Sequence, residues 1–379
     1  MPKGNEKVLM DFNFYMPVKV ISGKECVKKN QNAFSRFGKK CVIITGKTSA
    51  KISGALDDVI SCLNEQNTEY GIYDGISQNP LLSSCSEAGN FCKETSADFI
   101  VAIGGGSVLD AAKAAAIFAT NDFEKTSDIY KKEYKSAPLP LILIGTTAGT
   151  GSEVSPTAVI TVDETRLKKS ISGDQCFAKI ALCDPKYTYN IPRGITVSTA
   201  LDAFAHALEG FFSRKHSTTT DTFAKLALPV EWEALKTLAE GGELSEKERD
   251  ELYYASVYSG MVLAIGTVYP HGLGYALTER FGVPHGQACA VFDMNLLEWS
   301  EKYAPERAKE FFSLLGASYD EVLAVMNKLI DISESVKFSK EEIDEIISRF
   351  GDDNPKFKNV YGNFTSAVAK KLFTELFGE

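Results

Sequence analysis

The residues best suited to chemistry are one aspartate and three of the chain's four histidines. Asp202 and His206 are four residues apart, so on a helix both side chains project from one face. His271 and His285 follow, each beside a glycine. One carboxylate and three imidazoles suit Fe²⁺ or Zn²⁺ and leave room for a substrate oxygen, and a set without a thiolate argues against a closed structural zinc site. Spacing alone leaves open the alternative of three unrelated histidines.

A glycine-rich turn follows an apolar run at 100–103 and leads into a predicted helix. Its residues are Gly104, Gly105, Gly106 and Ser107. Glycines let a backbone approach a ligand closely, and the N–H groups at a helix start bind anions, so a pyrophosphate is the expected guest. The turn matches neither the standard dinucleotide fingerprint nor the Walker pattern. A tight turn without a ligand is the alternative.

A second loop, at 145–153, also follows a predicted strand. Small hydroxyl residues lie between its glycines and offer donors and acceptors without bulk: Thr146, Thr147, Thr150 and Ser152. An open α/β sheet binds ligands at the carboxyl ends of its parallel strands. The two loops together therefore predict a nucleotide site, although the second loop alone could be an ordinary flexible turn.

The elements that must position these residues divide the chain into two halves. Strands are predicted at 41–45, 69–73, 99–103, 139–144 and 181–183, and helices between them at 50–65 and 81–96. This alternation predicts a parallel sheet covered by helices on both faces, followed by a hairpin that starts at 159–162. Helices dominate after residue 196 and are predicted at 198–213, 220–240, 245–262, 304–315, 319–330 and 340–349. We predict an α/β nucleotide-binding domain over 1–190 and an all-helical metal-binding domain over 191–379.

Composition excludes several classes of protein. The net charge of −9 excludes a nucleic-acid reader that depends on phosphate attraction. Eight scattered cysteines without a Cys-x-x-Cys pair indicate reduced thiols in a cytoplasmic protein. Residues 1–7 lack the apolar segment of a secretory signal, and no apolar run approaches the length of a membrane span. Neither nucleic acid nor a membrane is an expected partner.

The motifs at 104–113, 146–153, 202–210 and 284–286 resemble the group III, iron-containing alcohol dehydrogenases. The resemblance follows the family order along nearly the whole chain, up to about residue 300. It implies a dehydroquinate-synthase-like fold, with a Rossmann-like parallel-sheet domain, an all-α domain and the active site between them. The implied reaction is the reversible, nicotinamide-linked oxidation of a primary alcohol to an aldehyde. The family often forms homodimers.

The resemblance also assigns residues. It implies that the metal ligands are Asp202, His206, His271 and His285, and that residues 104–107 bind the pyrophosphate. It places Thr146, Thr147, Thr150 and Ser152 along the adenosine and nicotinamide portions of the cofactor.

Three further residues resemble family contacts to the cofactor, and each has a plainer alternative. Asn79 precedes a proline, which is also ordinary turn chemistry. Lys169 lies in the basic part of the hairpin and could be a solvated turn lysine. Asp110 is expected to face the cleft, whereas a solvent-facing helix is the alternative for Asp110 and Lys113.

Two positions depart from the family pattern. Tyr275 stands where many relatives carry a further histidine, four residues after the third ligand, so a histidine proton relay is not expected. Tyr275 could line the pocket, donate a hydrogen bond or simply pack. The fourth histidine, His216, is no substitute, because its polar surroundings predict an exposed helix end.

The second departure is Gly46, which follows the strand at 41–45. NAD-using relatives place an aspartate there for the ribose hydroxyls. A carboxylate would repel a 2′-phosphate and glycine would not, so NADP(H) is predicted to be preferred over NAD(H). A zinc-dependent glycerol or polyol dehydrogenase, a dehydroquinate-synthase-like lyase that retains NAD, and a non-catalytic metal- and nucleotide-binding protein are the alternatives.

Overall fold

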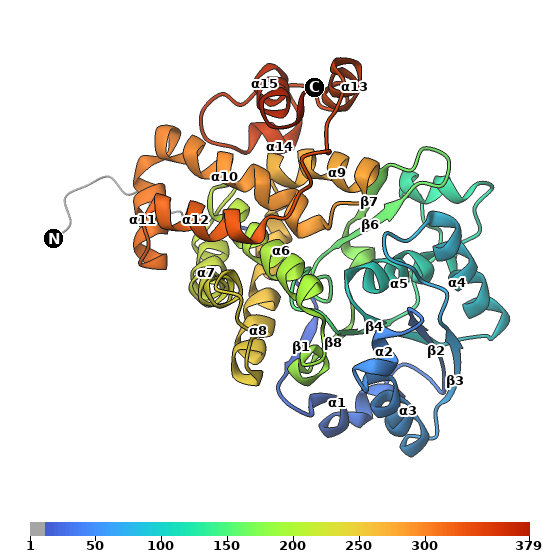
Figure 1. Cartoon of the computed structure of the whole chain (residues 1–379). Coiled ribbons are helices and arrows are strands. Elements are labelled where there is room, and N and C mark those ends of the chain that lie inside the picture. The colour runs from blue at the N-terminus through green and yellow to red at the C-terminus, as the bar shows by residue number, and fades with distance from the viewer. Residues whose placement is uncertain (1–11) are drawn as a thin grey trace.

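Six parallel strands form the sheet of the N-terminal half in this computed structural model, which describes residues 12–379 (Figure 1). The strand order is β1-β8-β5-β4-β2-β3. The strands are β1 (Lys19–Ser22), β2 (Lys40–Thr45), β3 (Glu69–Tyr73), β4 (Phe99–Gly104), β5 (Leu141–Gly145) and β8 (Ile180–Cys183). All five predicted strands are confirmed. Only β1 was missed, because it is a four-residue edge strand with a half-exposed pattern and carries little periodic signal.

Helices cover both faces of the sheet, as predicted. Side chains alternate along a strand, so β4 sends Ile100 and Ala102 to one face and Phe99 and Val101 to the other. Helices α4 (Leu82–Glu94) and α5 (Gly106–Phe118) bury the first face. The second face is buried by α1 (Cys26–Lys29), η1 (Gln31–Ser35) and α3 (Ala55–Glu65). Burial on both faces explains why these strands read as continuous apolar runs.

The single helix predicted at 50–65 is in fact two. Helix α2 (Ser49–Ile52) ends before Ser53, and α3 begins after Gly54. Gly54 has φ +79°, in the left-handed region that favours glycine and stops a right-handed helix.

The predicted hairpin is confirmed. Strands β6 (Thr157–Thr161) and β7 (Lys168–Ser172) pair antiparallel, apart from the main sheet. The chain then returns through η3 (Asp174–Cys176) to β8.

The C-terminal half is helical, and all six helices predicted there occur. The 3-10 turn η4 (Pro185–Thr188) ends the sheet half, and α6 begins at Arg193, so the predicted boundary at 190 lies between them. As a domain division it stays a prediction. The helices are α6 (Arg193–Phe211), α7 (Thr218–Ala239), α8 (Glu246–Val262), α9 (Tyr269–Phe281), α10 (His285–Tyr303), α11 (Pro305–Leu315), α12 (Tyr319–Leu329), α13 (Lys340–Ser348), α14 (Pro355–Lys358) and α15 (Ser366–Phe377).

Helices α9, α10, α14 and α15 were not predicted. Glycines in α9 and at the start of α10 lower the local preference for helix, and α14 is a single turn. The expectation that His216 is exposed is wrong. Its side chain is only 11% exposed, and its ring nitrogens lie 3.0 Å from Asp221 Oδ2 and 3.0 Å from Tyr361 Oη. Tyr361 is distant in sequence, so local polarity did not reveal this packing.

Among the described residues, no single helix is long and apolar enough to cross a membrane. One pair passes that test together, α8 with η5 (Leu263–Ile265) and α9, but it is bent by 108°. The stretch 1–7, whose polarity argued against a secretory signal, lies outside the described residues.

A buried charge network joins α5 to the second loop and the hairpin. The Lys113 ammonium is fully buried and donates to Ser152 Oγ at 2.8 Å and Thr157 O at 2.7 Å. It lies 3.6 Å from Asp110 Oδ1, which also accepts from Ser152 Oγ at 2.6 Å. Asp110 Oδ2 accepts from the Val159 N–H at 2.8 Å. The alternative of a solvent-facing Lys113 is therefore wrong.

Replacing Lys113 with methionine should destabilise the protein strongly. The apolar side chain keeps the volume but leaves the Asp110 carboxylate buried without its cation. We expect a loss of about 3–5 kcal/mol in the free energy of unfolding, measured by urea titration. The matched control is Lys131→Met, because Lys131 is largely exposed and water screens its pair with Asp128, so its loss should change the free energy of unfolding far less. Equal losses in the two variants would contradict the network.

Candidate metal and nucleotide site

The four predicted metal ligands meet at one oxygen atom. Helix α6 carries Asp202 and His206, α9 carries His271, and α10 begins at His285. The Nε2 atoms of His271, His206 and His285 lie 3.5, 3.7 and 3.9 Å from Asp202 Oδ1. Three imidazoles from three helices thus surround a single carboxylate oxygen.

The separations between these atoms suit shared coordination of a divalent metal better than hydrogen bonds among the side chains. Within residues 12–379, two of these converging atoms, Asp202 Oδ1 and His271 Nε2, are buried without a hydrogen-bond partner. Buried polar atoms are rarely left so. Separations of 3.5–3.9 Å are too long for hydrogen bonds. They are close to the roughly 3.3 Å expected between donors on one tetrahedral ion with bonds of about 2.0–2.1 Å.

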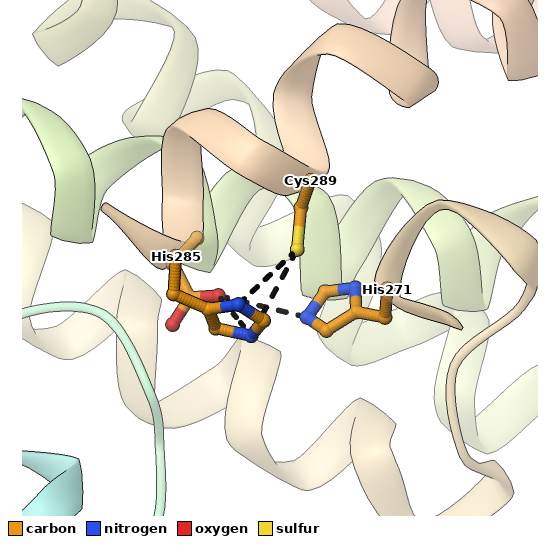
Figure 2. Close-up of side chains that lie close together, drawn as sticks. His271, His285 and Cys289 are labelled. Carbon is orange, nitrogen blue, oxygen red and sulfur yellow. Dashed lines mark hydrogen bonds and ion pairs between the residues drawn. The ribbon is translucent and has the colours of Figure 1, made fainter. Parts of the chain in front are cut away.

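A thiol that the sequence analysis did not include also lies beside this group. Cys289 Sγ lies 3.8 Å from both ring nitrogens of His285, and Figure 2 shows it with His271 around the same space. Donor atoms of Asp202, His271, His285 and Cys289 all lie within 4.8 Å of one another. His206 is not in that most compact group and joins it through Asp202.

The sequence analysis did not predict Cys289 as a site residue, because it considered cysteines only as Cys-x-x-Cys pairs. His285 and Cys289 are four residues apart on α10, the same spacing that singled out Asp202 and His206. That spacing could have found it.

Glu209 holds His271 in position. The carboxylate is completely buried, lies one turn beyond His206 on α6, and accepts a hydrogen bond from His271 Nδ1 through Oε1. Its Oε2 accepts from the Val268 N–H at 2.6 Å. A proton fixed on Nδ1 leaves Nε2 free as a ligand, which is the usual arrangement of a carboxylate behind a metal-binding histidine. The sequence showed Glu209 only as part of a motif.

Burial and neighbouring charges set the protonation of Asp202, His206 and His285 in the form that binds a metal. Burial raises the pKa of Asp202, but the surrounding histidines outweigh it and hold that pKa well below its usual range. Burial lowers the pKa of His206 and of His285, so both rings are neutral, the form that binds a metal. Burial raises the pKa of the Cys289 thiol to about 12.

Two glycines allow the helices to approach closely enough. A Cβ on Gly286 would lie 1.8 Å from Ser198 O and 2.8 Å from Asp202 N. The start of α10 therefore rests directly on α6, beside the central carboxylate. A Cβ on Gly274 would lie 2.6 Å from Ala288 O, where α9 meets α10. These glycines are required for space, since neither has a positive φ.

The two predicted nucleotide loops lie side by side. Strands β4 and β5 are neighbours with Gly104 opposite Gly145, and the Thr146 N–H donates to Gly104 O at 3.0 Å. Helix α5 begins at Gly106, so the N–H groups of its first turn lie at this edge.

The glycines of the first loop also serve packing. A Cβ on Gly105 would lie 3.1 Å from the Thr147 side chain, and one on Gly106 would lie 2.5 Å from Thr150. Close packing between the two loops therefore requires glycine at these positions. This requirement adds to the close approach to a ligand for which the sequence predicted them.

Other predicted cofactor residues gather at the same edge. The Asn79 N–H donates to Ser107 Oγ at 3.3 Å, and Gly46 follows the end of β2, the neighbour of β4. Asp110 and Ser152 bond to each other in the buried network, and their contact with a cofactor stays a prediction.

The hairpin lysine that turns toward the metal group is Lys168. Its Nζ lies 5.4 Å from the centre of the Tyr275 ring, and Tyr275 stacks on His285 at 5.3 Å and 12°. Lys169 is exposed, with its Nζ 4.4 Å from the Tyr130 ring centre. Adjacent strand residues face opposite sides, so a shift of one position reverses the direction of a side chain. Contact between Lys169 and a cofactor stays a prediction.

Replacing Gly286 with alanine should disrupt the metal group without touching any ligand. The added methyl collides with the α6 backbone, which cannot yield as a flexible side chain would, so His285 moves away from Asp202. We expect at least a roughly 10-fold loss of Zn²⁺ affinity, measured by competition with a chelating dye. The control is Gly194→Ala, since a Cβ there meets nothing within 4 Å. Unchanged zinc affinity in Gly286→Ala would contradict the role given to this contact.

Comparison with known proteins agrees with this arrangement. Residues 17–185 match the family described as iron-containing alcohol dehydrogenase, and residues 196–347 match the C-terminal part of the same family. The chain is 30% identical to alcohol dehydrogenase 4 of Schizosaccharomyces pombe, over 87% of this chain and 79% of that protein. It is 28% identical to an NADPH-dependent butanol dehydrogenase of Clostridium saccharobutylicum, over 91% of this chain and 88% of that protein.

A solved structure agrees as well. An iron-containing alcohol dehydrogenase from Thermotoga maritima superposes with a TM-score of 0.87 at 33% identity, covering 96% of this chain and 99% of that one. The fold is therefore shared over nearly the full length of both chains. The chain belongs to the iron-containing alcohol dehydrogenase family.

Proposed function

We propose that this enzyme interconverts primary alcohols and aldehydes with a nicotinamide cofactor, NADP(H) being favoured, and with a divalent metal held by Asp202, His206, His271 and His285. The observation that carries the proposal is the convergence of three imidazoles on one buried carboxylate oxygen. Family membership supports the reaction class. Fe²⁺ is the metal we propose from the family, and Zn²⁺ suits the same donors.

The metal and the nicotinamide cofactor, when bound, would supply the reactive chemistry. A bound metal would act as a Lewis acid on the substrate oxygen, and the nicotinamide would exchange a hydride with the carbinol carbon. The chain's own residues prepare the site. Glu209 fixes the ring of His271, and Asp202 stays ionised among the imidazoles. The Gly104–Ser107 turn and the neighbouring threonine loop bind the cofactor phosphates and sugars.

The proton of the alcohol needs a separate route. Tyr275 lies against His285, but burial raises its pKa, so at neutral pH its hydroxyl holds its proton. We propose that Tyr275 shapes the pocket and that the proton leaves through water or the ribose hydroxyls.

The preference for NADP(H) rests on Gly46. Neither a carboxylate nor bulk stands there, and the neighbouring Lys47, Thr48 and Ser49 can donate to a 2′-phosphate. Relatives named NADPH-dependent and NADH-dependent butanol dehydrogenases both occur, so the family by itself does not decide the cofactor.

The alternative functions can be distinguished by their turnover of the cofactor. A glycerol or polyol dehydrogenase would show the same cofactor turnover with a different alcohol, whereas a dehydroquinate-synthase-like lyase would show no net reduction of the nicotinamide. A non-catalytic protein would bind cofactor without turnover.

We also propose a cytoplasmic location, supported by eight free, buried cysteines in the described chain. The homodimer stays a prediction.

Replacing His271 or His285 with alanine should abolish turnover and spare nucleotide binding. Losing a ligand removes several kcal/mol of stabilisation of the developing charge, so kcat/KM for butanal should fall at least ~1000-fold. The Kd for NADPH, measured by fluorescence titration, should change less than about 3-fold, because the loops lie on the other half. The control is His216→Gln, a histidine outside the site. Activity that survives both alanine variants would refute the metal assignment.

Replacing Gly46 with aspartate should reverse the cofactor preference. The new carboxylate repels a 2′-phosphate and can accept from ribose hydroxyls, so the ratio of kcat/KM for NADPH to that for NADH should fall by roughly 10- to 100-fold. Gly46→Asn is the matched control, because it adds the same bulk next to Ile76 O without the charge. A wild-type enzyme with comparable kcat/KM for both cofactors would refute the preference.

A further inference from the structure

Cys289 lies among the candidate metal ligands, yet the proposed function gives it no role. Its sulfur is 3.8 Å from Nδ1 and 3.8 Å from Nε2 of His285. The residue is completely buried, one turn after His285 on α10. The helix therefore presents the imidazole and the thiol on the same face, toward the space that Figure 2 shows between the labelled side chains.

The distances match donors that share an ion. A sulfur and a nitrogen bound to one metal, with bonds of about 2.3 and 2.0–2.1 Å, lie roughly 3.1–3.8 Å apart for bond angles of about 90–120°. The observed 3.8 Å lies at the upper end of that range.

Two independent atoms point into the same space. In the part of the chain that the structure describes, Asp202 Oδ1 and His271 Nε2 have no hydrogen-bond partner, although both residues are more than nine-tenths buried. A carboxylate oxygen of Asp202 and a ring nitrogen of His271 each lie within 4.8 Å of Cys289 Sγ. These two unpartnered atoms and the thiol surround one buried space and suit a cation, since packing alone would leave the cost of burying them uncompensated.

We propose that Cys289 binds the catalytic metal directly, as a fifth protein ligand beside Asp202, His206, His271 and His285. The inference rests on the proposed metal site. The S–H bond breaks as the metal–sulfur bond forms, and the proton passes to solvent; no electron is transferred. The thiolate takes a position next to His285 in the substrate-free enzyme.

This ligand has two consequences. A thiolate is a soft donor, so it favours Zn²⁺ and Co²⁺ over ions that prefer oxygen. It also occupies coordination space that a set of one carboxylate and three imidazoles would leave open, so a substrate oxygen must compete with sulfur for the metal.

Cobalt reports the sulfur directly. The full-length protein, stripped of metal with a chelator under anaerobic conditions, is titrated with one equivalent of Co²⁺. We expect an intense near-ultraviolet thiolate-to-cobalt charge-transfer band in the wild type and no such band in Cys289→Ala. X-ray absorption of the zinc form should show a sulfur neighbour at about 2.3 Å in the wild type alone.

The controls separate the thiol from the fold. Cys92→Ala removes another buried cysteine, on α4 in the other half, and should keep the cobalt band. Cys289→Ser keeps the size of the side chain and should lose the band with an unchanged melting temperature. Zinc affinity should fall in both Cys289 variants by on the order of 10- to 100-fold.

The outcomes distinguish this inference from the function on which it rests. If the wild type binds one Co²⁺ without a charge-transfer band and without a sulfur neighbour, the proposal for Cys289 is refuted and the proposed metal site stands. If the wild type binds no Co²⁺, both are refuted. If band and sulfur neighbour are present and persist in Cys289→Ala, another thiol is the ligand and the proposal fails.

Discussion

The Asp202 carboxylate is the group on which the arrangement of the helical half depends. It is an ionised side chain buried at 4% exposure, and one of its oxygens faces three imidazoles at 3.5–3.9 Å. A buried carboxylate without a partner lowers the stability of the fold, because the free energy of its hydration is lost. In the proposed function, a divalent cation at this point would compensate that cost and take the imidazoles as ligands. The helices α6, α9 and α10 are placed so that all four groups meet there.

Close packing supports that geometry. Gly286 lets the start of α10 rest on the α6 backbone, and Gly274 lets α9 approach α10. Glu209 then directs His271 from behind through a hydrogen bond to its ring. The site is therefore built on helices whose separation is set by backbone contacts. Such contacts vary little, which is what a metal with demanding bond lengths requires.

The hairpin connects the two halves at the site. The Lys168 N–H donates to Glu279 Oε1 on α9 at 2.8 Å, and the Lys168 side chain reaches over Tyr275. The same hairpin is joined to α5 through Lys113, which donates to Thr157 O. The helix that starts at the nucleotide loop and the helix that carries His271 are thus linked through one element. The cofactor edge and the metal group are positioned by the same packing.

Sequence reasoning succeeded where a local pattern decides the outcome. Strands buried on both faces are continuous apolar runs, the glycine turns follow them, and residues four apart share a helix face, so the fold class and the meeting of Asp202 with His206 could be predicted. Reasoning failed for α9 and α10, because their glycines lower helix propensity while serving contacts between helices.

What the sequence by itself determined is the set of ligand types, the two loops and their order. Only the tertiary structure decided that Cys289 lies beside the predicted ligands, that Lys168 and not Lys169 turns toward His285, and that Glu209 stands behind His271. The physical reason is that spacing along one element fixes directions within that element. Distances between elements depend on how closely their backbones pack, and that is set by contacts between residues far apart in the chain.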